Sequence, residues 1–250
     1  MANIGFLGCG KIGKAMVSHI QAGGRHSVSF VQDPFFQNDC QLDCPVTGRL
    51  DERLCKADLV VECATADVLQ DNFEYYLAQG DMLVFSLTAF SDEAFAQKAF
   101  AVCKANDTRI YFPHGAILGL DGIFDARETL SSVTIETIKN PASLGREDRQ
   151  RTIVYQGSTR DACSLYPRNV NVHAAVALAG LGFDKTQSKI ISDPAASTNS
   201  HVIRVEGEGA SFRLEVSSFA SGGVTGSYTP LSACGSLDRV LGNDAISRFV

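Results

Sequence analysis

Residues 4–13 read Ile-Gly-Phe-Leu-Gly-Cys-Gly-Lys-Ile-Gly, an apolar strand-like run that passes directly into the pattern Gly-x-Gly-x-x-Gly. A segment with helical spacing follows, with Ile12, Met16 and Ile20 on one face. The next strand-like segment, 27–32, is followed at once by Asp33, about 20 residues after Gly13. This order predicts a βαβ unit that binds the pyrophosphate of a dinucleotide at the start of its helix.

Each residue of this motif has a physical role in such a unit. Gly8 permits the tight turn out of the strand, Gly10 lets the pyrophosphate approach the backbone, and Gly13 allows close packing of helix on sheet. Lys11 adds a cation at the positive end of the helix dipole. The candidates for cofactor contact in this part of the chain are Gly8, Gly10, Lys11, Ile12, Gly13, Asp33 and Ala64.

Asp33 bears on the choice between NAD and NADP. Its carboxylate is expected to accept hydrogen bonds from the adenosine ribose and to repel a 2′-phosphate. No Arg or Lys follows within 34–38, and Arg25 is the one nearby cation in the preceding turn. The cofactor is therefore expected to be NAD or NADP, with NAD favoured. The alternative is that Asp33 is only a turn residue before Pro34.

The fold class is predicted as α/β, with an N-terminal Rossmann dinucleotide-binding domain and a second α+β substrate domain. Residues 1–110 alternate strands with helices, which implies parallel pairing, and a closing helix within 227–250 is assigned to the same domain. Residues 111–226 form the substrate and oligomerisation domain. The expected elements of the first domain are strands at 4–7, 27–32, 58–64, 82–87 and 108–112, and helices at 11–21, 50–54, 68–79 and from a Ser91 cap to 104.

The second domain is expected to hold a largely antiparallel sheet. Its predicted elements are strands at 131–139, 189–192, 201–206 and 211–217, a hairpin turn at 207–209, a loop at 140–149 and an apolar helix at 171–181. We expect that helix to cover one face of the sheet and Val202, Arg204 and Leu214 to lie on the other. An uncovered face favours a homodimer or larger symmetric assembly.

Composition excludes several other classes. The net charge of −6 without a basic block argues against a nucleic-acid partner. No apolar run approaches the roughly 18 residues of a membrane span, and we expect no signal peptide before the first strand. The eight scattered cysteines fit free thiols in a reducing cytoplasm, where we expect this protein to be soluble. Cys40 and Cys44 lack a second ligand pair, so no metal site is expected.

Of the five histidines, His201 is the candidate for acid–base chemistry. It follows the polar segment 193–200 at the expected entry to a strand, where a loop delivers a side chain to a sheet edge. A solvated histidine at the start of a strand is the alternative. Asn171 either caps the apolar helix or contacts a ligand, and the glycine-rich segment 112–121 allows close approach of a ligand to the backbone.

Four stretches together resemble the L-aspartate dehydrogenases, the NAD(P)-dependent kind linked to NAD biosynthesis. They are the motif at 8–13, Pro-x-Gly-Ala-x-x-Gly-Leu-Asp at 113–121, Pro-Arg-Asn-Val-Asn-Val at 167–172, and Asp193-Pro194 followed by the segment 199–207. The resemblance implies oxidation of an amino-acid substrate, L-aspartate, to iminoaspartate, which hydrolyses to oxaloacetate and ammonia. It implies that His201 is catalytic and that Ala116 and Asn171 contact the cofactor.

Two positions depart from that pattern, because the family often has Ser where this chain has His114 and Ala where it has His173. The expected substrate contacts are His114, Arg168 and Asn171. The alternatives are another amine or imine oxidoreductase, of the dihydrodipicolinate-reductase or homoserine-dehydrogenase type, and a non-catalytic NAD-binding redox sensor. A homoserine dehydrogenase is disfavoured, since the acidic and lysine residues of its substrate motif are not found.

Overall fold

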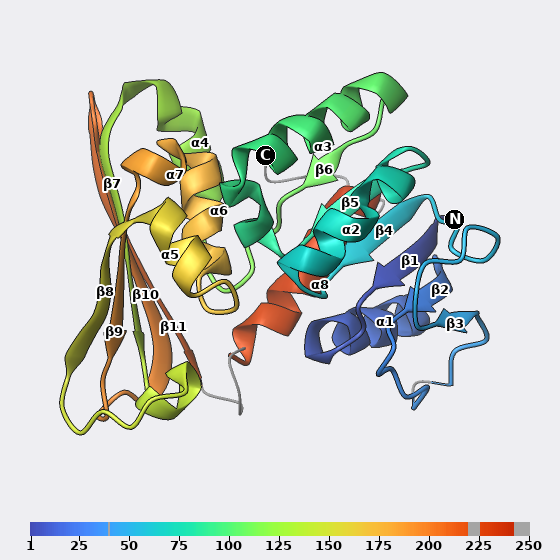
Figure 1. Ribbon diagram of the computed structural model, residues 1–250, viewed down its shortest axis with the longest axis horizontal. Helices are drawn as coiled ribbons and strands as arrows, with labels where there is room; N and C mark the ends of the chain where they lie inside the picture. Colours follow the sequence, from blue (N-terminus) through green and yellow to red (C-terminus); the bar gives the residue numbers. More distant parts are fainter. Residues whose placement is uncertain (40, 220–225, 243–250) are drawn as a thin grey trace. The chain divides into compact units, whose positions relative to one another are not determined.

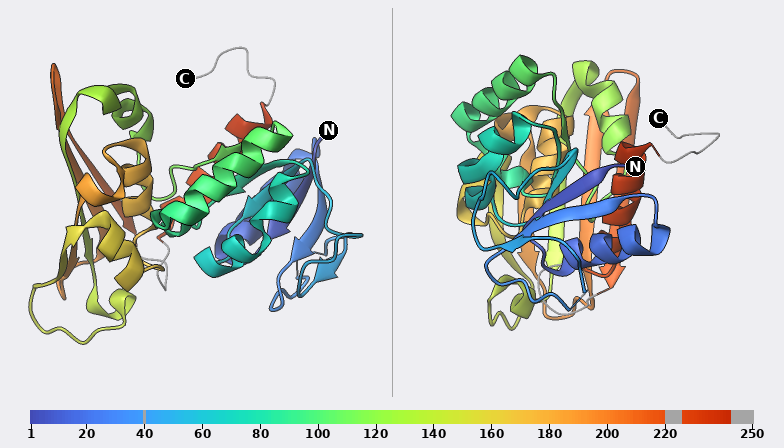
Figure 2. Two further views of the ribbon diagram at one scale, coloured as in Figure 1. Left: turned by 45° about the horizontal axis from the view of Figure 1, so that its top comes forward. Right: turned by 90° about the vertical axis from the view of Figure 1, so that its right-hand side faces the viewer.

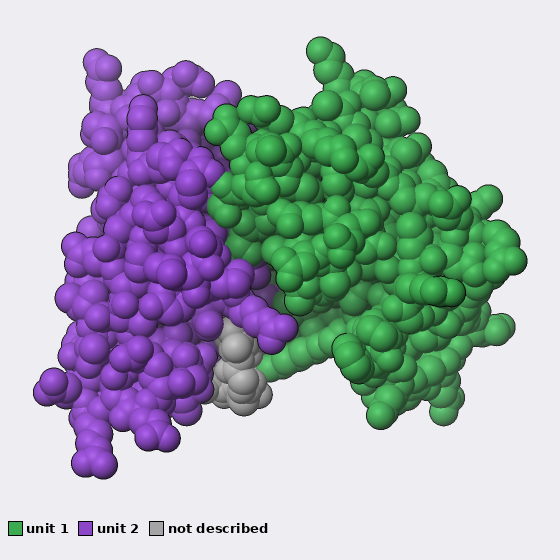
Figure 3. Space-filling view, viewed as in Figure 1, with its two compact units in different colours: residues 1–113, 230–249 green, residues 114–229, 250 purple. Residues whose placement is uncertain are grey.

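The structure is a computed structural model, and it describes residues 1–39, 41–219 and 226–242. The chain divides into two compact units (Figure 3). Unit 1 contains Met1–Pro113 and the described residues from Pro230, and unit 2 contains His114–Thr229. Cys40 and the end of the segment 227–250 lie outside the described residues. No described helix is long and apolar enough to cross a membrane.

Unit 1 is built on a six-stranded parallel sheet in the order β3-β2-β1-β4-β5-β6 (Figure 1). This order and the parallel pairing confirm the Rossmann-type fold predicted from the sequence. The strands are β1 (Asn3–Leu7), β2 (Ser27–Gln32), β3 (Val46–Thr47), β4 (Leu59–Glu62), β5 (Asp81–Val84) and β6 (Ile110–Tyr111), and the helices are α1 (Lys11–Gly23), α2 (Ala66–Leu77), η1 (Leu87–Ser91), α3 (Glu93–Asn106) and α8 (Tyr228–Leu241).

Helices cover both faces of this sheet. On one face, Ile4 and Phe6 of β1 share a buried core with Met16 of α1 and with Leu237 of α8. On the other, the Phe30 ring of β2 stacks on Tyr76 of α2 at 5.7 Å between centroids. Burial on both faces explains why the strand sequences are almost continuously apolar.

Two local predictions in unit 1 are wrong, and one strand was missed. The expected helix at 50–54 is a turn, in which the Asp51 side chain accepts from Arg53 N, because so short a segment cannot offset helix nucleation. The cap of α3 is Asp92, whose carboxylate accepts from the amides of the first turn, while the Ser91 hydroxyl donates to Thr88 O. The two-residue strand β3 was not predicted.

Unit 2 is an α+β unit with a five-stranded sheet in the order β11-β10-β7-β9-β8. All pairs are antiparallel except β7 with β9, which agrees with the largely antiparallel sheet expected. The strands are β7 (Leu130–Lys139), β8 (Thr152–Ser158), β9 (Gln187–Ser192), β10 (Thr198–Gly207) and β11 (Ala210–Phe219), and the helices are α4 (Leu120–Ala126), η2 (Arg127–Thr129), η3 (Pro141–Leu144), α5 (Thr159–Leu165), α6 (Asn171–Ala179) and α7 (Gly182–Lys185).

Helices α5, α6 and α7 lie along one face of this sheet (Figures 1 and 2). We call this the inner face. Alternation on β7 places Val133, Ile135, Thr137 and Lys139 on it, all buried. The outer face carries charged side chains, among them Glu136, which is 3.3 Å from Lys189 Nζ.

One expectation about the faces of the sheet is corrected. Leu214 pairs with Ile203 across the β10–β11 ladder and therefore lies on the inner face, not the outer one. Val202 lies on the outer face as expected, opposite Glu136 and Glu215, and is only 4 % exposed. The strand β8 and the helix α5 were not predicted. The hairpin turn at 207–209 was predicted correctly, since Gly207 pairs with Ala210 and Gly209 has φ +88°.

Candidate active site

The turn between β1 and α1 leaves open space at the start of the helix. Gly8 has φ +82°, and a Cβ there would lie 2.7 Å from the Ala64 backbone, so only glycine fits. At Gly10 an added Cβ would meet no atom within 4 Å, so packing within the chain does not require this glycine. Gly10 is also the N-cap residue of α1 and gives no side-chain cap. Open space in front of an uncapped helix start fits the pyrophosphate of a dinucleotide.

The third glycine has the packing role expected of it. A Cβ at Gly13 would lie 3.1 Å from Cys63 Sγ and 3.2 Å from Cys9 Sγ, distances too short for ordinary contact. The Cys63 thiol donates to Gly8 O at 3.0 Å. Helix α1 therefore rests directly on the ends of β1 and β4.

Asp33 has a structural role beside its proposed role at the ribose. Its Oδ2 accepts from Cys9 N at 2.8 Å, which ties the end of β2 to the glycine-rich turn, and its Oδ1 accepts from Phe35 N. A cation also lies beside the following loop: Lys14 Nζ is 2.6 Å from Asp39 Oδ2. The sequence did not reveal this lysine, because it reaches the loop from α1 and not from the residues after Asp33.

Glu62, at the end of β4, is a buried carboxylate that the sequence reasoning missed. Ser86 N (2.9 Å) and Phe85 N (3.2 Å) donate to its Oε2, and Ala64 N (2.8 Å) and Ser86 Oγ (2.7 Å) donate to its Oε1. Burial raises the pKa of Glu62, and the hydrogen bonds act against that rise. The residue joins the carboxyl ends of β4 and β5, where ligands of such sheets bind.

In unit 2 the structure corrects the position of His201. Strand β10 begins at Thr198, so His201 lies within the strand and is 3 % exposed, instead of entering it from a solvated loop. The polar residues before it are part of the strand: Thr198 and Ser200 hydroxyls bond to each other, and Ser200 to Ser217. The alternation turns Asn199 and His201 to the buried inner face.

His201 is the first member of a buried hydrogen-bond chain that crosses the inner face. Its Nδ1 is 2.8 Å from Thr137 Oγ1, and the same hydroxyl is 2.6 Å from His173 Nε2. On the other side of that ring, His173 Nδ1 is 2.9 Å from Ser188 Oγ. Ser188 Oγ is 2.8 Å from Thr159 Oγ1, which donates to Thr186 O at 2.9 Å. The side chains of all these residues are buried. We call this set the His201–Thr186 chain.

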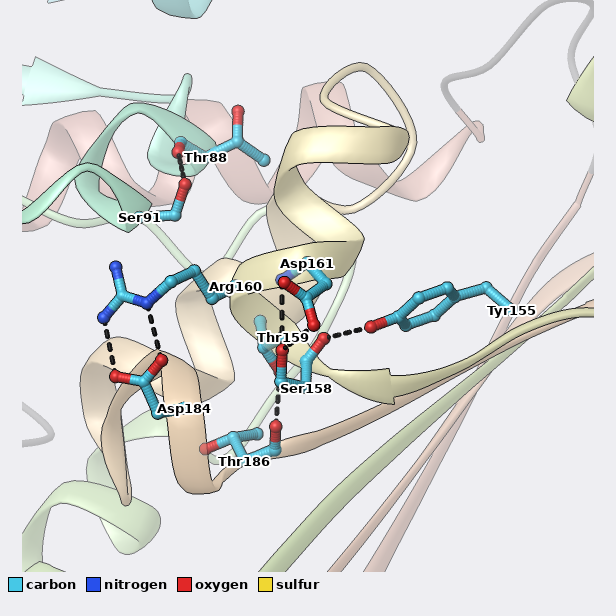
Figure 4. Close-up of polar contacts among 9 residues, drawn as sticks. All are labelled: Thr88, Ser91, Tyr155, Ser158, Thr159, Arg160, Asp161, Asp184 and Thr186. Carbon is cyan, nitrogen blue, oxygen red and sulfur yellow. Dashed lines mark hydrogen bonds and ion pairs between the residues drawn. The ribbon is translucent and has the colours of Figure 1, made fainter.

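The far end of the His201–Thr186 chain is firmly anchored (Figure 4). Thr159 donates both its backbone N–H and its hydroxyl to Thr186 O. The Ser158 hydroxyl caps α5 by accepting from Asp161 N, and a two-bond ion pair between Arg160 and Asp184 joins α5 to α7. The geometry at Thr159 is thus fixed by the secondary structure around it.

Lys139, two residues after Thr137 on the same face of β7, is 3 % exposed. Its side chain has no hydrogen bond or ion pair within the described parts of the chain, and burial lowers the pKa of Lys139 to about 8. Burial and then the charge of Lys139 lower the pKa of His201 to about 3. Burial, followed by the charges of His201 and Lys139, lowers the pKa of His173 well below its usual value. Both imidazoles are therefore neutral at pH 7.

The other predicted site residues lie outside this chain of bonds. His114 and Ala116 are half-buried in a turn closed by Ile117 N donating to His114 O, with Gly115 at φ +61°. Asn171 is the first residue of α6, and the N-cap position is Val170, so the capping interpretation of Asn171 is wrong. Arg168 is exposed in the preceding turn.

Comparisons with known proteins cover nearly the whole chain. Residues 121–240 match the sequence model described as "Aspartate dehydrogenase, C-terminal", and residues 8–113 match "Homoserine dehydrogenase, NAD binding domain". The chain is 34 % identical to an L-aspartate dehydrogenase of Methanococcoides burtonii over 96 % of its own length and 97 % of that protein's.

Solved structures agree with this likeness. The crystal structure of aspartate dehydrogenase from Thermotoga maritima has a TM-score of 0.81 and 27 % identity, with all of both chains covered. A dihydrodipicolinate reductase from Paenisporosarcina has a TM-score of 0.55 at 14 % identity, covering 97 % of this chain and 94 % of that one. That second likeness concerns the fold alone.

Proposed function

The chain belongs to the L-aspartate dehydrogenase family, and we propose that it oxidises L-aspartate to iminoaspartate, which is then hydrolysed to oxaloacetate and ammonia. The observation that carries the proposal is a neutral, buried His201 on the same sheet face as a buried Lys139 that has no ion pair within the described residues. A neutral imidazole can accept a proton, and a buried cation can hold the carboxylate of a dicarboxylic substrate.

The N-terminal unit contains an NAD-binding domain. We propose that Gly8, Gly10, Gly13 and the start of α1 hold the pyrophosphate, that Asp33 holds the adenosine ribose, and that Lys11, Ile12, Ala64, Ala116 and Asn171 complete the contacts. When bound, the nicotinamide accepts the hydride that leaves the substrate carbon. Each Asp33 carboxylate oxygen already accepts one backbone hydrogen bond and can accept a second one from a ribose hydroxyl. The carboxylate would repel a 2′-phosphate, which favours NAD over NADP.

His201 acts on water in this proposal. Once the substrate carbon has lost its hydride, the imine needs a water molecule deprotonated as it attacks, and a neutral imidazole is the base that the inner face provides. The low pKa of His201 opposes proton uptake in the free protein. A substrate carboxylate beside Lys139 would offset the lysine charge and raise the pKa of His201, so that substrate binding itself would strengthen the base.

The remaining substrate contacts are proposed more broadly. Aspartate has two carboxylates, and Lys139 serves one of them. His114, Asn171 and Arg168 are proposed for the other. Arg168 is exposed at its place in unit 2, so its contribution would require the bound substrate or cofactor to cover it.

The test is turnover of L-aspartate, followed as NADH or NADPH formation, by the wild type, His201→Ala and His19→Ala. Loss of the general base should lower kcat by about two to four orders of magnitude while NADH affinity is unchanged. His19→Ala is the control, because this exposed histidine pairs with Asp238 at the surface. Full activity of folded His201→Ala would refute the assignment, and cofactor binding without turnover of any amino acid would favour the redox sensor.

We also propose that the protein is a cytoplasmic homodimer or larger assembly. The seven cysteines within the described residues are all free thiols, as suits a reducing compartment. The outer face of the unit 2 sheet, which no described helix of that unit covers (Figure 1), exposes Ile153 (56 %) and Phe219 (76 %). Self-association through this face would bury them. A monomer mass by light scattering at micromolar concentration would contradict the assembly.

A further inference from the structure

We propose that the His201–Thr186 chain fixes the tautomer of His201, with the ring proton on Nδ1 and the lone pair on Nε2. Thr137 and His173 are then positioning residues for the general base. This inference rests on the proposed function only for its catalytic meaning. The tautomer itself follows from counting protons along the chain of bonds.

The backbone carbonyl of Thr186, at the end of the chain of bonds, can only accept hydrogen bonds. The Thr159 hydroxyl lies 2.9 Å from that oxygen and has a single proton, which it donates there. The 2.8 Å bond between Thr159 and Ser188 must then use the proton of Ser188. With its proton committed, Ser188 can only accept from His173 Nδ1 at 2.9 Å. The imidazole of His173 therefore has its proton on Nδ1.

The Thr137 hydroxyl lies between the two imidazoles and determines which nitrogen of His201 has the proton. A neutral His173 with a proton on Nδ1 has a lone pair on Nε2, so the Thr137 hydroxyl donates to it at 2.6 Å. Thr137 then has no proton left for His201, and its oxygen accepts from His201 Nδ1 at 2.8 Å. Nε2 is left as the single basic nitrogen of His201. Complete burial of His173, with the charge of Lys139 nearby, keeps the His173 imidazole neutral, which this assignment of protons requires.

The direction in which these hydrogen bonds are donated decides which nitrogen of His201 is basic, because the single hydroxyl proton of Thr137 lies between two imidazoles. If Thr137 donated to His201, Nε2 of His201 would have the proton and the base would be lost. The fixed acceptor at Thr186 excludes that arrangement. Neutral imidazoles without such a constraint favour the Nε2–H form, so the structure holds His201 in the less common tautomer.

Nitrogen-15 NMR of histidine-labelled protein tests this directly, because the two ring nitrogens differ in chemical shift according to which one carries the proton. The five histidines are assigned with His173→Gln and His201→Gln. We expect Nδ1–H for both His173 and His201 in the wild type at pH 7 without substrate. An Nε2–H tautomer at His201, or a mixture of the two, would overturn the proposal.

A matched pair of substitutions tests the chain as the cause. Thr137→Val removes the central hydroxyl and keeps the shape, so His201 should shift toward the Nε2–H form. Thr186→Val is the control: the Thr186 hydroxyl is buried and has no hydrogen-bond partner among the described residues, and the chain ends on the backbone carbonyl, which remains. The Thr186 variant should keep the wild-type tautomer. An unchanged His201 tautomer in folded Thr137→Val would show that the chain does not set it.

Kinetics then show whether the tautomer matters for catalysis. Thr137→Val should lower kcat about 10-fold or more with KM for aspartate little changed, and Thr137→Ser, which restores the hydroxyl, should recover most of the loss. A purely structural role would lower thermal stability without this recovery and without the NMR change. An Nδ1–H signal in a protein that turns over no aspartate would refute the proposed function and leave the tautomer assignment standing.

Discussion

Replacing Lys139 with methionine should make the protein more stable and a poorer binder of its substrate. Methionine has nearly the length of lysine and no charge, so it fills the same buried position and removes the charge of a residue that is 3 % exposed and has no ion pair within the described residues. We therefore expect Lys139→Met to raise the free energy of unfolding and to raise KM for L-aspartate.

The size of the stability gain follows from the pKa of Lys139, which burial lowers from 10.5 to about 8. Since each pH unit of pKa corresponds to about 1.4 kcal/mol, keeping this lysine charged at pH 7 costs the folded state about 3 kcal/mol. The unfolded chain binds the proton more tightly, so the cost is complete below pH 8 and disappears as the pH rises toward 10.5. The advantage of Lys139→Met should follow the same course.

Urea denaturation of both proteins at pH 7 and pH 10 measures this difference. Lys189→Met is the control, because Lys189 lies on the outer face beside Glu136 and is half-exposed, and its loss should cost no more than about 1 kcal/mol. A gain for Lys139→Met that is equal at the two pH values, or a loss of stability at pH 7, would refute the reasoning.

Binding of succinate, a dicarboxylate without an amine, isolates the role of Lys139 in substrate recognition. The wild type should bind it less tightly as the pH rises through about 8, where Lys139 loses its charge. Lys139→Met should bind it weakly at every pH. A wild-type affinity that does not change between pH 7 and pH 9.5 would place the carboxylate elsewhere.

The remaining predictions concern the N-terminal unit. Gly10→Val should fold normally, because its Cβ meets nothing within 4 Å, yet lose most of its NADH affinity by calorimetry; unchanged affinity would show that the pyrophosphate binds elsewhere. The ratio of kcat/KM with NAD to that with NADP should exceed one because of Asp33, and a strong preference for NADP would contradict this. Glu62→Gln should cost about 1–3 kcal/mol in thermal or urea unfolding, since an amide nitrogen cannot accept from the Phe85 and Ser86 donors it would face; an unaffected melting temperature would count against this.

Much of the first unit could be predicted from its sequence because its information is local. The glycines at 8, 10 and 13 specify a turn whose geometry hardly depends on distant residues, and strands buried on both faces are apolar without interruption. Glu62 was missed because its role depends on contacts that the local sequence does not show. A single acidic residue at the end of an apolar strand shows nothing of the four donors that surround it in the fold.

The candidate site of the second unit was only half predictable. His201 was identified, but its polar neighbours Thr198 and Ser200 resemble a loop, whereas cross-strand hydroxyl bonds hold them in β10. Its imidazole bonds to Thr137 of β7, 64 residues away in sequence, and through that hydroxyl to His173 of α6, 28 residues away. Only the register of the sheet brings Thr137 opposite His201. Lys139 was passed over because lysines are rarely buried, and its place followed only from the alternation of β7.

The His201–Thr186 chain begins at an imidazole and ends at a peptide carbonyl, and a carbonyl cannot release a proton to solvent. Proton transfer along this chain of bonds therefore could not carry a proton from His201 to solvent. In the proposed reaction, a proton taken up at His201 would have to leave by the same nitrogen that received it, either onto the departing ammonia or onto water that enters after the products have gone. Regeneration of the base is thereby linked to emptying of the site, and the enzyme would be ready for a new substrate only once the old one has been cleared.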